Sequence, residues 1–144
     1  MHKTGSHRNL VRNNGVKYGY HIEHILVDNS ENRMLFNGDE KAFIQQRNRL
    51  GALLLLRGAD NQSSRNELYS EKLKTYSHAP RLAASLCSDF YHSNPSFKQM
   101  IQQHGLNFRP LATFGVDEIE ERHSLYFDMA KLIWGDESFP KRAA

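Results

Sequence analysis

Cysteine is nearly absent from this chain, because Cys87 is the only one among its 144 residues. A lone cysteine excludes an internal disulfide and a zinc site built from several thiolates. It also removes the usual ligands and reactive pairs of redox proteins. We therefore expect Cys87 to be a small, buried, apolar residue of the core.

Long apolar runs are missing too. The mean hydropathy is −0.67, and no stretch approaches the ~18 apolar residues that a membrane-spanning helix needs. The basic, polar start has no apolar core of a signal peptide. Because the length suits one domain of ordinary size, we expect a single domain that is cytoplasmic and has no membrane partner.

Acidic residues are scarce in the first half of the chain. Residues 1–22 contain none, and residues 47–66 contain four arginines but only one acidic residue, Asp60. The basic residues of these two segments are Lys3, Arg8, Arg12, Lys17, Arg47, Arg49, Arg57 and Arg65. Basic and acidic residues balance in residues 73–144. The positive charge suits a polyanionic partner, although an ordinary solvated surface explains the charge alone equally well.

The hydropathy pattern divides the chain into an arm, a mixed core and a helical extension. Residues 1–15 are polar and basic and predict a flexible arm. Val16, Tyr18, Tyr20 and Ile22 alternate as in a strand with one buried face, and Glu23 and His24 follow at its end. The next expected elements are a turn-rich stretch over 29–38, a short helix over 39–50 with Phe43 and Ile44 inward, a strand over 52–56, a loop over 57–66 and a helix over 67–76.

Residues 78–144 predict only helices. Pro80 opens a helical pattern that continues through Leu82, Leu86 and Phe90, and Asn94-Pro95 starts another that ends at Gly105. Asp117 and Glu120 have the spacing of a capping box. The last helix would then carry an inward stripe of Ile119, Tyr126, Ile133 and Trp134.

Three polar residues have the chemistry to hydrolyse a phosphodiester. Glu23 is a hard oxygen ligand for Mg²⁺ or Mn²⁺, and Asn61 offers an amide oxygen to the same ion. His24 is the natural general base for water, because histidine titrates near neutral pH. Successive strand residues point to opposite faces, so Glu23 and His24 converge only where the strand has ended in a turn or bulge.

The order of motifs resembles the HNH branch of the ββα-metal nucleases, and within it the C-terminal nuclease domain of GmrSD-type modification-dependent restriction enzymes. The motifs are Glu23-His24-Ile25-Leu26, Leu50-Gly51-Ala52-Leu53-Leu54-Leu55-Leu56, Asn61, Asn66, Lys72 with Tyr76, and the closing stretch from Phe114 to Arg122 with Ile133-Trp134. The resemblance covers roughly residues 18 to 134. It implies an α+β fold, with a ββα-metal core of an antiparallel hairpin and a helix at 16–77 and an all-helical extension at 78–144.

The resemblance also implies roles for single residues. Glu23 and Asn61 would be the metal ligands and His24 the general base. Val27 and Ala52 depart from the family pattern, which has proline and asparagine at these two positions. The asparagine amide typically ties down the loop that carries the catalytic histidine, so with Ala52 the base must be held in another way or the site is impaired.

Five further residues are candidates for contacts with nucleic acid: Arg49, Arg57, Arg65, Asn66 and Lys72. Each has a structural alternative. Asn66 suits the cap of the following helix, and the stem of Lys72 suits a cover over apolar surface. His21 precedes His24 by three residues, and a strand histidine more often packs sideways than binds a metal.

The sequence thus predicts a divalent-metal-dependent DNA endonuclease that restricts foreign or modified DNA. In the resembled enzymes a nucleotide-hydrolysing NTPase domain precedes the nuclease, so we expect such a domain or partner chain to act with this one. A second hypothesis is a catalytically impaired module that binds nucleic acid or supports assembly. A third is a purely helical interaction domain with a chance Glu-His pair.

Overall fold

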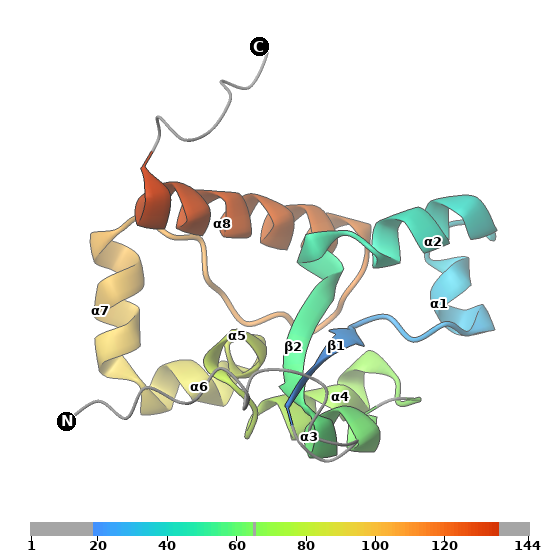
Figure 1. Ribbon diagram of the computed structural model, residues 1–144, viewed down its shortest axis with the longest axis horizontal. Helices are drawn as coiled ribbons and strands as arrows, with labels where there is room; N and C mark the ends of the chain where they lie inside the picture. Colours follow the sequence, from blue (N-terminus) through green and yellow to red (C-terminus); the bar gives the residue numbers. More distant parts are fainter. Residues whose placement is uncertain (1–18, 65, 136–144) are drawn as a thin grey trace, which may run out of the picture.

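The computed structural model describes residues 19–64 and 66–135. Two short strands lie among a series of helices, of which the last is the longest (Figure 1). In chain order the elements are β1 (Tyr20–His24), α1 (Ser30–Met34), α2 (Glu40–Arg47), the 3₁₀ turn η3 (Leu50–Ala52), β2 (Leu53–Arg57), α3 (Gly58–Ser64), α4 (Tyr69–Tyr76), α5 (Arg81–Ala84), α6 (Ser88–Ser93), α7 (Pro95–Gln103) and α8 (Val116–Trp134). The predicted α+β fold class is confirmed, and the strand pair excludes a purely helical domain.

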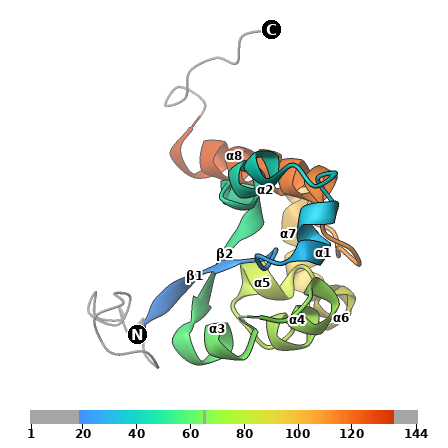
Figure 2. The same cartoon turned by 90° about the vertical axis from the view of Figure 1, so that its right-hand side faces the viewer.

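The two strands form an antiparallel pair that places the Glu-His motif in the middle of the molecule. Tyr20 pairs with Arg57 and His24 with Leu53 in an unbroken register. The predicted hairpin with a long inserted connection is therefore confirmed. The pair lies between α8 on one side and α3 with α4 on the other, as both views show (Figures 1 and 2).

The prediction of which face of β1 is buried was wrong. Ile22 is 63 % exposed whereas Glu23 is 4 % exposed. Paired residues of an antiparallel ladder point to the same side, so Glu23 shares its inward face with Leu54. The alternation in the sequence was real, but side chains alternate in either orientation and only the packing against the helices selects the face. Val16 and Tyr18 lie outside the described residues.

The core gathers around the inward face of the sheet. It combines apolar side chains from β2, from the loop after β1, and from α2, α4 and α8. Its fully buried members include Phe43, Tyr76, Leu56 and Ile119. Phe43 points inward as predicted, whereas Ile44 is 38 % exposed, so that half of the prediction was wrong.

Two stretches that looked like turn and loop contain helices. Residues 29–38 include α1, which begins at the cap Asn29, whose side chain accepts a hydrogen bond from the Asn32 backbone N–H at 2.8 Å. The expected loop over 57–66 is largely the helix α3, which follows β2 directly. α3 contacts β1, β2 and α4, so tertiary packing stabilises a helix that its polar sequence does not predict. Helix α4 confirms the expected helix over 67–76 apart from its first residues.

The C-terminal half is helical, with different details from those predicted. The pattern opened by Pro80 is split between α5 and α6, while α7 begins at Pro95 as expected. α8 begins after Gly115, whose N–H donates to Glu118 Oε2 at 2.8 Å, and not at a cap on Asp117. Its last turn leaves Ile133 and Trp134 more than half exposed, so the inward stripe ends before them. No helix in the described part of the chain is long and apolar enough to cross a membrane.

Candidate active site around His24

His24 lies at the end of β1 and points to the outward face of the strand pair. Its pairing with Leu53 places it on the same face as Ile22 and Leu55, which are both exposed. The ring atom Nε2 is 2.8 Å from Oδ1 of Asn48, which follows the last turn of α2. Asn48 in turn donates from Nδ2 to the carbonyl of Ile44 at 2.8 Å. His24 is therefore half-exposed and held through its ring.

Glu23 points the other way, into the core. Its Oε1 accepts hydrogen bonds from Lys72 Nζ at 2.5 Å and from the Tyr76 hydroxyl at 3.1 Å. The side chains of Lys72 and Glu23 are 1 % and 5 % exposed, so the ion pair is buried. A buried carboxylate and ammonium stabilise each other only when both stay in place, because either one alone would be an uncompensated charge.

Burial shifts the ionisation of both partners of Glu23. Loss of hydration lowers the pKa of Lys72 from its ordinary value, and the nearby Glu23 carboxylate opposes that shift. The pKa of Tyr76 is raised above its ordinary value, first by burial and then by the negative charge of Glu23. Tyr76 therefore acts as a neutral hydrogen-bond donor to the carboxylate throughout the range in which proteins work.

The backbone on both sides of His24 is tied down. Lys72 Nζ also donates to the His24 carbonyl at 2.7 Å, so a single ammonium holds Glu23 and the main chain of its neighbour. The N–H of Ile25 donates to the carbonyl of Ala52 at 3.0 Å, which extends the strand pairing one step beyond His24. The ring, the carbonyl and the following N–H thus each have a partner, and these partners are Asn48 after α2, Lys72 of α4 and Ala52 of η3.

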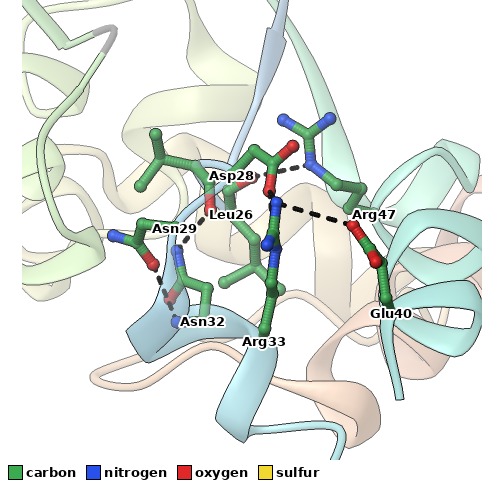
Figure 3. A network of polar contacts seen from close by, with 8 residues as sticks. Leu26, Asp28, Asn29, Asn32, Arg33, Glu40 and Arg47 are labelled. Carbon is green, nitrogen blue, oxygen red and sulfur yellow. Dashed lines mark hydrogen bonds and ion pairs between the residues drawn. The ribbon is translucent and has the colours of Figure 1, made fainter. Parts of the chain in front are cut away.

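The loop that follows His24 is braced by the first two helices, as Figure 3 shows. Arg47 Nε donates to the Leu26 carbonyl at 3.2 Å, and Asn32 Nδ2 donates to the Val27 carbonyl at 2.8 Å. Arg33 forms a two-armed contact with Asp28, in which Nε and Nη2 lie 3.0 and 2.8 Å from Oδ1. Val27, which stands where proline is usual, therefore has its carbonyl anchored by Asn32.

Ala52 is 0 % exposed and belongs to the core cluster. Its methyl group makes no hydrogen bond, but its backbone carbonyl holds the loop after His24 through Ile25. Helix α8 covers the adjacent turn, where Arg122 Nε donates to the Gly51 carbonyl at 2.8 Å. The loop is therefore held by main-chain and arginine contacts in place of an asparagine side chain at position 52.

Glu23 and Asn61 do not fit a metal ion that both would hold in this arrangement. Oxygen ligands for Mg²⁺ or Mn²⁺ must present free lone pairs to the ion, whereas Glu23 Oε1 accepts from an ammonium and a hydroxyl inside the core. β1 continues through both Glu23 and His24 without a bulge, so the two side chains leave opposite faces. Across residues 19–64 and 66–135, no group of three or more His, Cys, Asp or Glu side chains is placed to hold a metal.

The other residues predicted for the site lie on several elements. Asn61 is half-buried on α3. His21 shares the inward face of Glu23, and its Nε2 is buried without a hydrogen-bond partner. Its position agrees with a histidine packed sideways in the strand.

The residues predicted to contact nucleic acid are not equally accessible. Arg57 is exposed at the end of β2 and Asn66 is exposed before α4, whereas Lys72 is buried in its ion pair and presents no charge to a phosphate. Arg49 Nη2 is 2.6 Å from Glu120 Oε2 of α8, so its charge is shared with an acidic neighbour. Arg65 lies outside the described residues.

Sequence reasoning did not identify Asn48, the partner of the His24 ring. Asn48 lies 24 residues from His24, and it follows α2 as an ordinary helix-ending residue. A signal was nevertheless present: an asparagine stands four residues before Ala52, where the family's own asparagine is missing.

A strand pair with a Glu-His motif at the end of β1, followed by packed helices, is consistent with the core of an HNH-type nuclease domain. The family described as GmrSD restriction endonucleases, C-terminal domain, matches residues 2–129. The chain belongs to this family, and membership implies a restriction endonuclease that acts on DNA. No curated protein matched the chain, and no solved structure matched it.

Proposed function

We propose that this chain is a divalent-metal-dependent endonuclease that hydrolyses phosphodiester bonds in foreign or modified DNA, with His24 as its general base. The observation that carries the proposal is His24 itself. It lies half-exposed on the outward face of the strand pair, with its ring held by Asn48, in a chain that belongs to a restriction endonuclease family. An oriented, accessible imidazole is the group that proton transfer from water needs.

His24 acts by accepting a proton from a water molecule. As the proton moves to the ring, the water oxygen attacks phosphorus and the bond from phosphorus to the leaving oxygen breaks. The leaving oxygen takes a proton from solvent, and the imidazolium later returns its own proton to solvent. The outward face gives DNA access to the ring, and the exposed Arg57 at the other end of β2 offers positive charge to the backbone.

The dependence on Mg²⁺ or Mn²⁺ is supported by family membership. Such an ion would stabilise the negative charge that develops on the phosphate. In the observed arrangement of the site the ion would need ligands other than the predicted pair Glu23 and Asn61, because the Glu23 carboxylate is held in the buried ion pair with Lys72. For that reason His24 alone carries the reaction step described above.

Specificity is proposed to come from an associated nucleotide-hydrolysing NTPase domain or chain, as in the enzymes that the sequence resembles. The expected place of action is the cytoplasm, where incoming DNA is met.

A plasmid-nicking assay tests the proposal. Supercoiled plasmid, with and without modified bases, is incubated with the protein and Mg²⁺ or Mn²⁺, and parallel reactions contain EDTA. We expect nicked and linear products, loss of about 10²- to 10⁴-fold in rate for His24→Ala, and no products with EDTA. His92→Ala is the matched control, because His92 is an exposed histidine on α6. Equal rates for wild type and His24→Ala would remove His24 from the reaction.

A catalytically impaired module that binds nucleic acid is the second candidate. The observation that favours it is the burial of Glu23, which keeps the motif's carboxylate away from solvent. This candidate predicts that wild type and His24→Ala bind DNA equally in a gel-shift assay and that neither cleaves it.

A further inference from the structure

The ring of His24 is held by an amide whose own orientation is fixed. Asn48 Nδ2 donates to the Ile44 carbonyl at 2.8 Å, which directs its Oδ1 toward His24 Nε2 at 2.8 Å. Turning the amide over would place Nδ2 against the ring and Oδ1 against a carbonyl, which would replace the helix-end hydrogen bond by a contact between two acceptors. The backbone of Asn48 is in the αR region, with φ −93° and ψ −1°, so it continues the last turn of α2 without strain.

An amide oxygen can only accept a hydrogen bond, so the proton between the two residues belongs to His24 Nε2. A neutral imidazole carries one proton, which leaves Nδ1 with a lone pair. We propose that Asn48 is the positioning residue that selects the Nε2–H tautomer of His24 and makes Nδ1 the atom that accepts the proton from water. This inference rests on the proposed nuclease function and adds the atom that performs it.

The main chain supports this arrangement. The His24 carbonyl accepts from Lys72 Nζ at 2.7 Å, and the Ile25 N–H donates to the Ala52 carbonyl at 3.0 Å. With the backbone fixed on both sides, the remaining freedom of His24 is rotation of its side chain. The hydrogen bond to Asn48 restricts that rotation. An asparagine at the end of α2 thus orients the histidine in a chain that has alanine, and no side-chain amide, at position 52.

The same hydrogen bond assists the proton transfer. When Nδ1 accepts a proton from water, the ring becomes an imidazolium with protons on both nitrogens. The Nε2–H then points at the Asn48 oxygen, and a hydrogen bond from a charged donor is stronger than one from a neutral donor. Asn48 therefore stabilises the protonated ring as well as the reactive tautomer.

Two variants of Asn48 separate the acceptor from the size of the side chain. Asn48→Asp keeps an oxygen acceptor for the ring but loses the hydrogen bond to the Ile44 carbonyl, whereas Asn48→Leu keeps the approximate volume and removes both the acceptor and the donor. The tautomer is read by ¹⁵N–¹H NMR of the imidazole at pH ~8, where an ordinary histidine is neutral. Comparison with His24→Ala assigns the signal among the eight histidines.

We expect wild type and Asn48→Asp to show a protonated Nε2 and an unprotonated Nδ1, and Asn48→Leu to show a mixture of tautomers. In the nicking assay, Asn48→Leu should lower kcat by about 10- to 100-fold, as is usual for residues that orient a catalytic group, with KM retained. Thermal unfolding of each variant checks that the fold is intact.

A protonated Nδ1 in wild type would overturn the inference, as would an Asn48→Leu protein with unchanged tautomer and kcat. The NMR reading needs no cleavage, so it separates the two hypotheses. If wild type shows the expected tautomer and cleaves no DNA, the hydrogen bond stands and the nuclease function fails.

Discussion

At the scale of single residues, the ion pair between Glu23 and Lys72 determines how the Glu-His motif is used. The Glu23 carboxylate, which the sequence predicts to be a metal ligand, points into the core, and its neighbour His24 faces outward. Lys72 spans both residues through the Glu23 carboxylate and the His24 carbonyl. The motif thus combines an anchor and a candidate base on opposite faces of one strand.

Lys72→Met should destabilise the fold by about 3–5 kcal/mol, because it leaves the buried Glu23 carboxylate without its counter-charge. Urea denaturation measures the change. Glu23→Gln combined with Lys72→Met should recover most of the lost stability, since no buried charge is then left without a partner. Lys74→Met is the matched control, because the exposed Lys74 pairs with Glu71 at the surface, and it should change stability little.

A metal role for Glu23 makes a contrasting prediction. If Glu23 bound Mg²⁺ in the folded protein, millimolar Mg²⁺ would raise the melting temperature of wild type but not of Glu23→Gln. We expect no such difference, because the carboxylate is already bonded to Lys72 and Tyr76.

Ala52→Asn restores the asparagine that the family pattern has at this position, and it tests whether the absence of that side chain lowers stability or cleavage. We expect the free energy of unfolding to fall by about 1–3 kcal/mol, because the amide would be buried in an apolar cluster without a hydrogen-bond partner. Cleavage should not increase, since the loop is already held by Ile25, Arg47 and Asn32. Ala112→Asn, at an exposed position, is the control. Faster cleavage by Ala52→Asn would show that the missing amide limits the site.

At the scale of elements, the close contact between η3 and α8 holds the turn that directly precedes β2. Gly51 is buried against the helix, and a Cβ added there would lie 2.1 Å from the Ile119 carbonyl oxygen. Arg122 bonds the Gly51 carbonyl from the same helix. The long C-terminal helix therefore fixes the turn that presents Ala52 to the His24 loop.

Gly51→Ala should cost about 1–3 kcal/mol, because the methyl group would push backbone against backbone. The chemical-denaturation midpoint reports the loss, and the nicking rate should fall with it as η3 moves. Gly115→Ala is the control, since a Cβ there meets Glu118 Oε2 at 3.6 Å, an ordinary contact. A Gly51→Ala protein as stable as wild type would mean that α8 can shift away from η3 at little cost.

At the scale of the whole molecule, buried tyrosines make the fold sensitive to alkali. Burial raises the pKa of Tyr69, Tyr76 and Tyr126 above the ordinary value of 10.0, and it raises the pKa of Tyr91 to about 12. Above that ordinary value the native protein binds more protons than the unfolded chain, so stability falls as the pH rises. The lowered pKa of Lys72 acts in the opposite sense, but only below its ordinary value of 10.5.

We therefore expect the free energy of unfolding to decrease above pH 10.5, with each tyrosine contributing at most about 1.4 kcal/mol per pH unit. Urea titrations at a series of alkaline pH values measure the slope, and tyrosinate absorbance follows the ionisation. Tyr69→Phe should make the slope shallower by one such contribution. A slope that is independent of this substitution would show that Tyr69 ionises in the native state.

The sequence by itself determined the order of strand, helix, strand and helix, and it determined the family. These features are local: period-two alternation, turn residues and the spacing of the Glu-His, Leu-Gly-Ala and Lys-Tyr motifs can be read without knowing what each segment touches. The start of α7 at Pro95 and the helix after α3 follow from the same local signals.

Only the tertiary structure decided which face of β1 enters the core and which partners Glu23 and His24 take. A strand alternates identically in either orientation, so packing against α4 and α8 had to choose Glu23 as the buried residue. Lys72 reaches Glu23 across 49 residues and Asn48 reaches His24 across 24. Such pairings depend on how helices dock, which the spacing of residues along the chain does not encode.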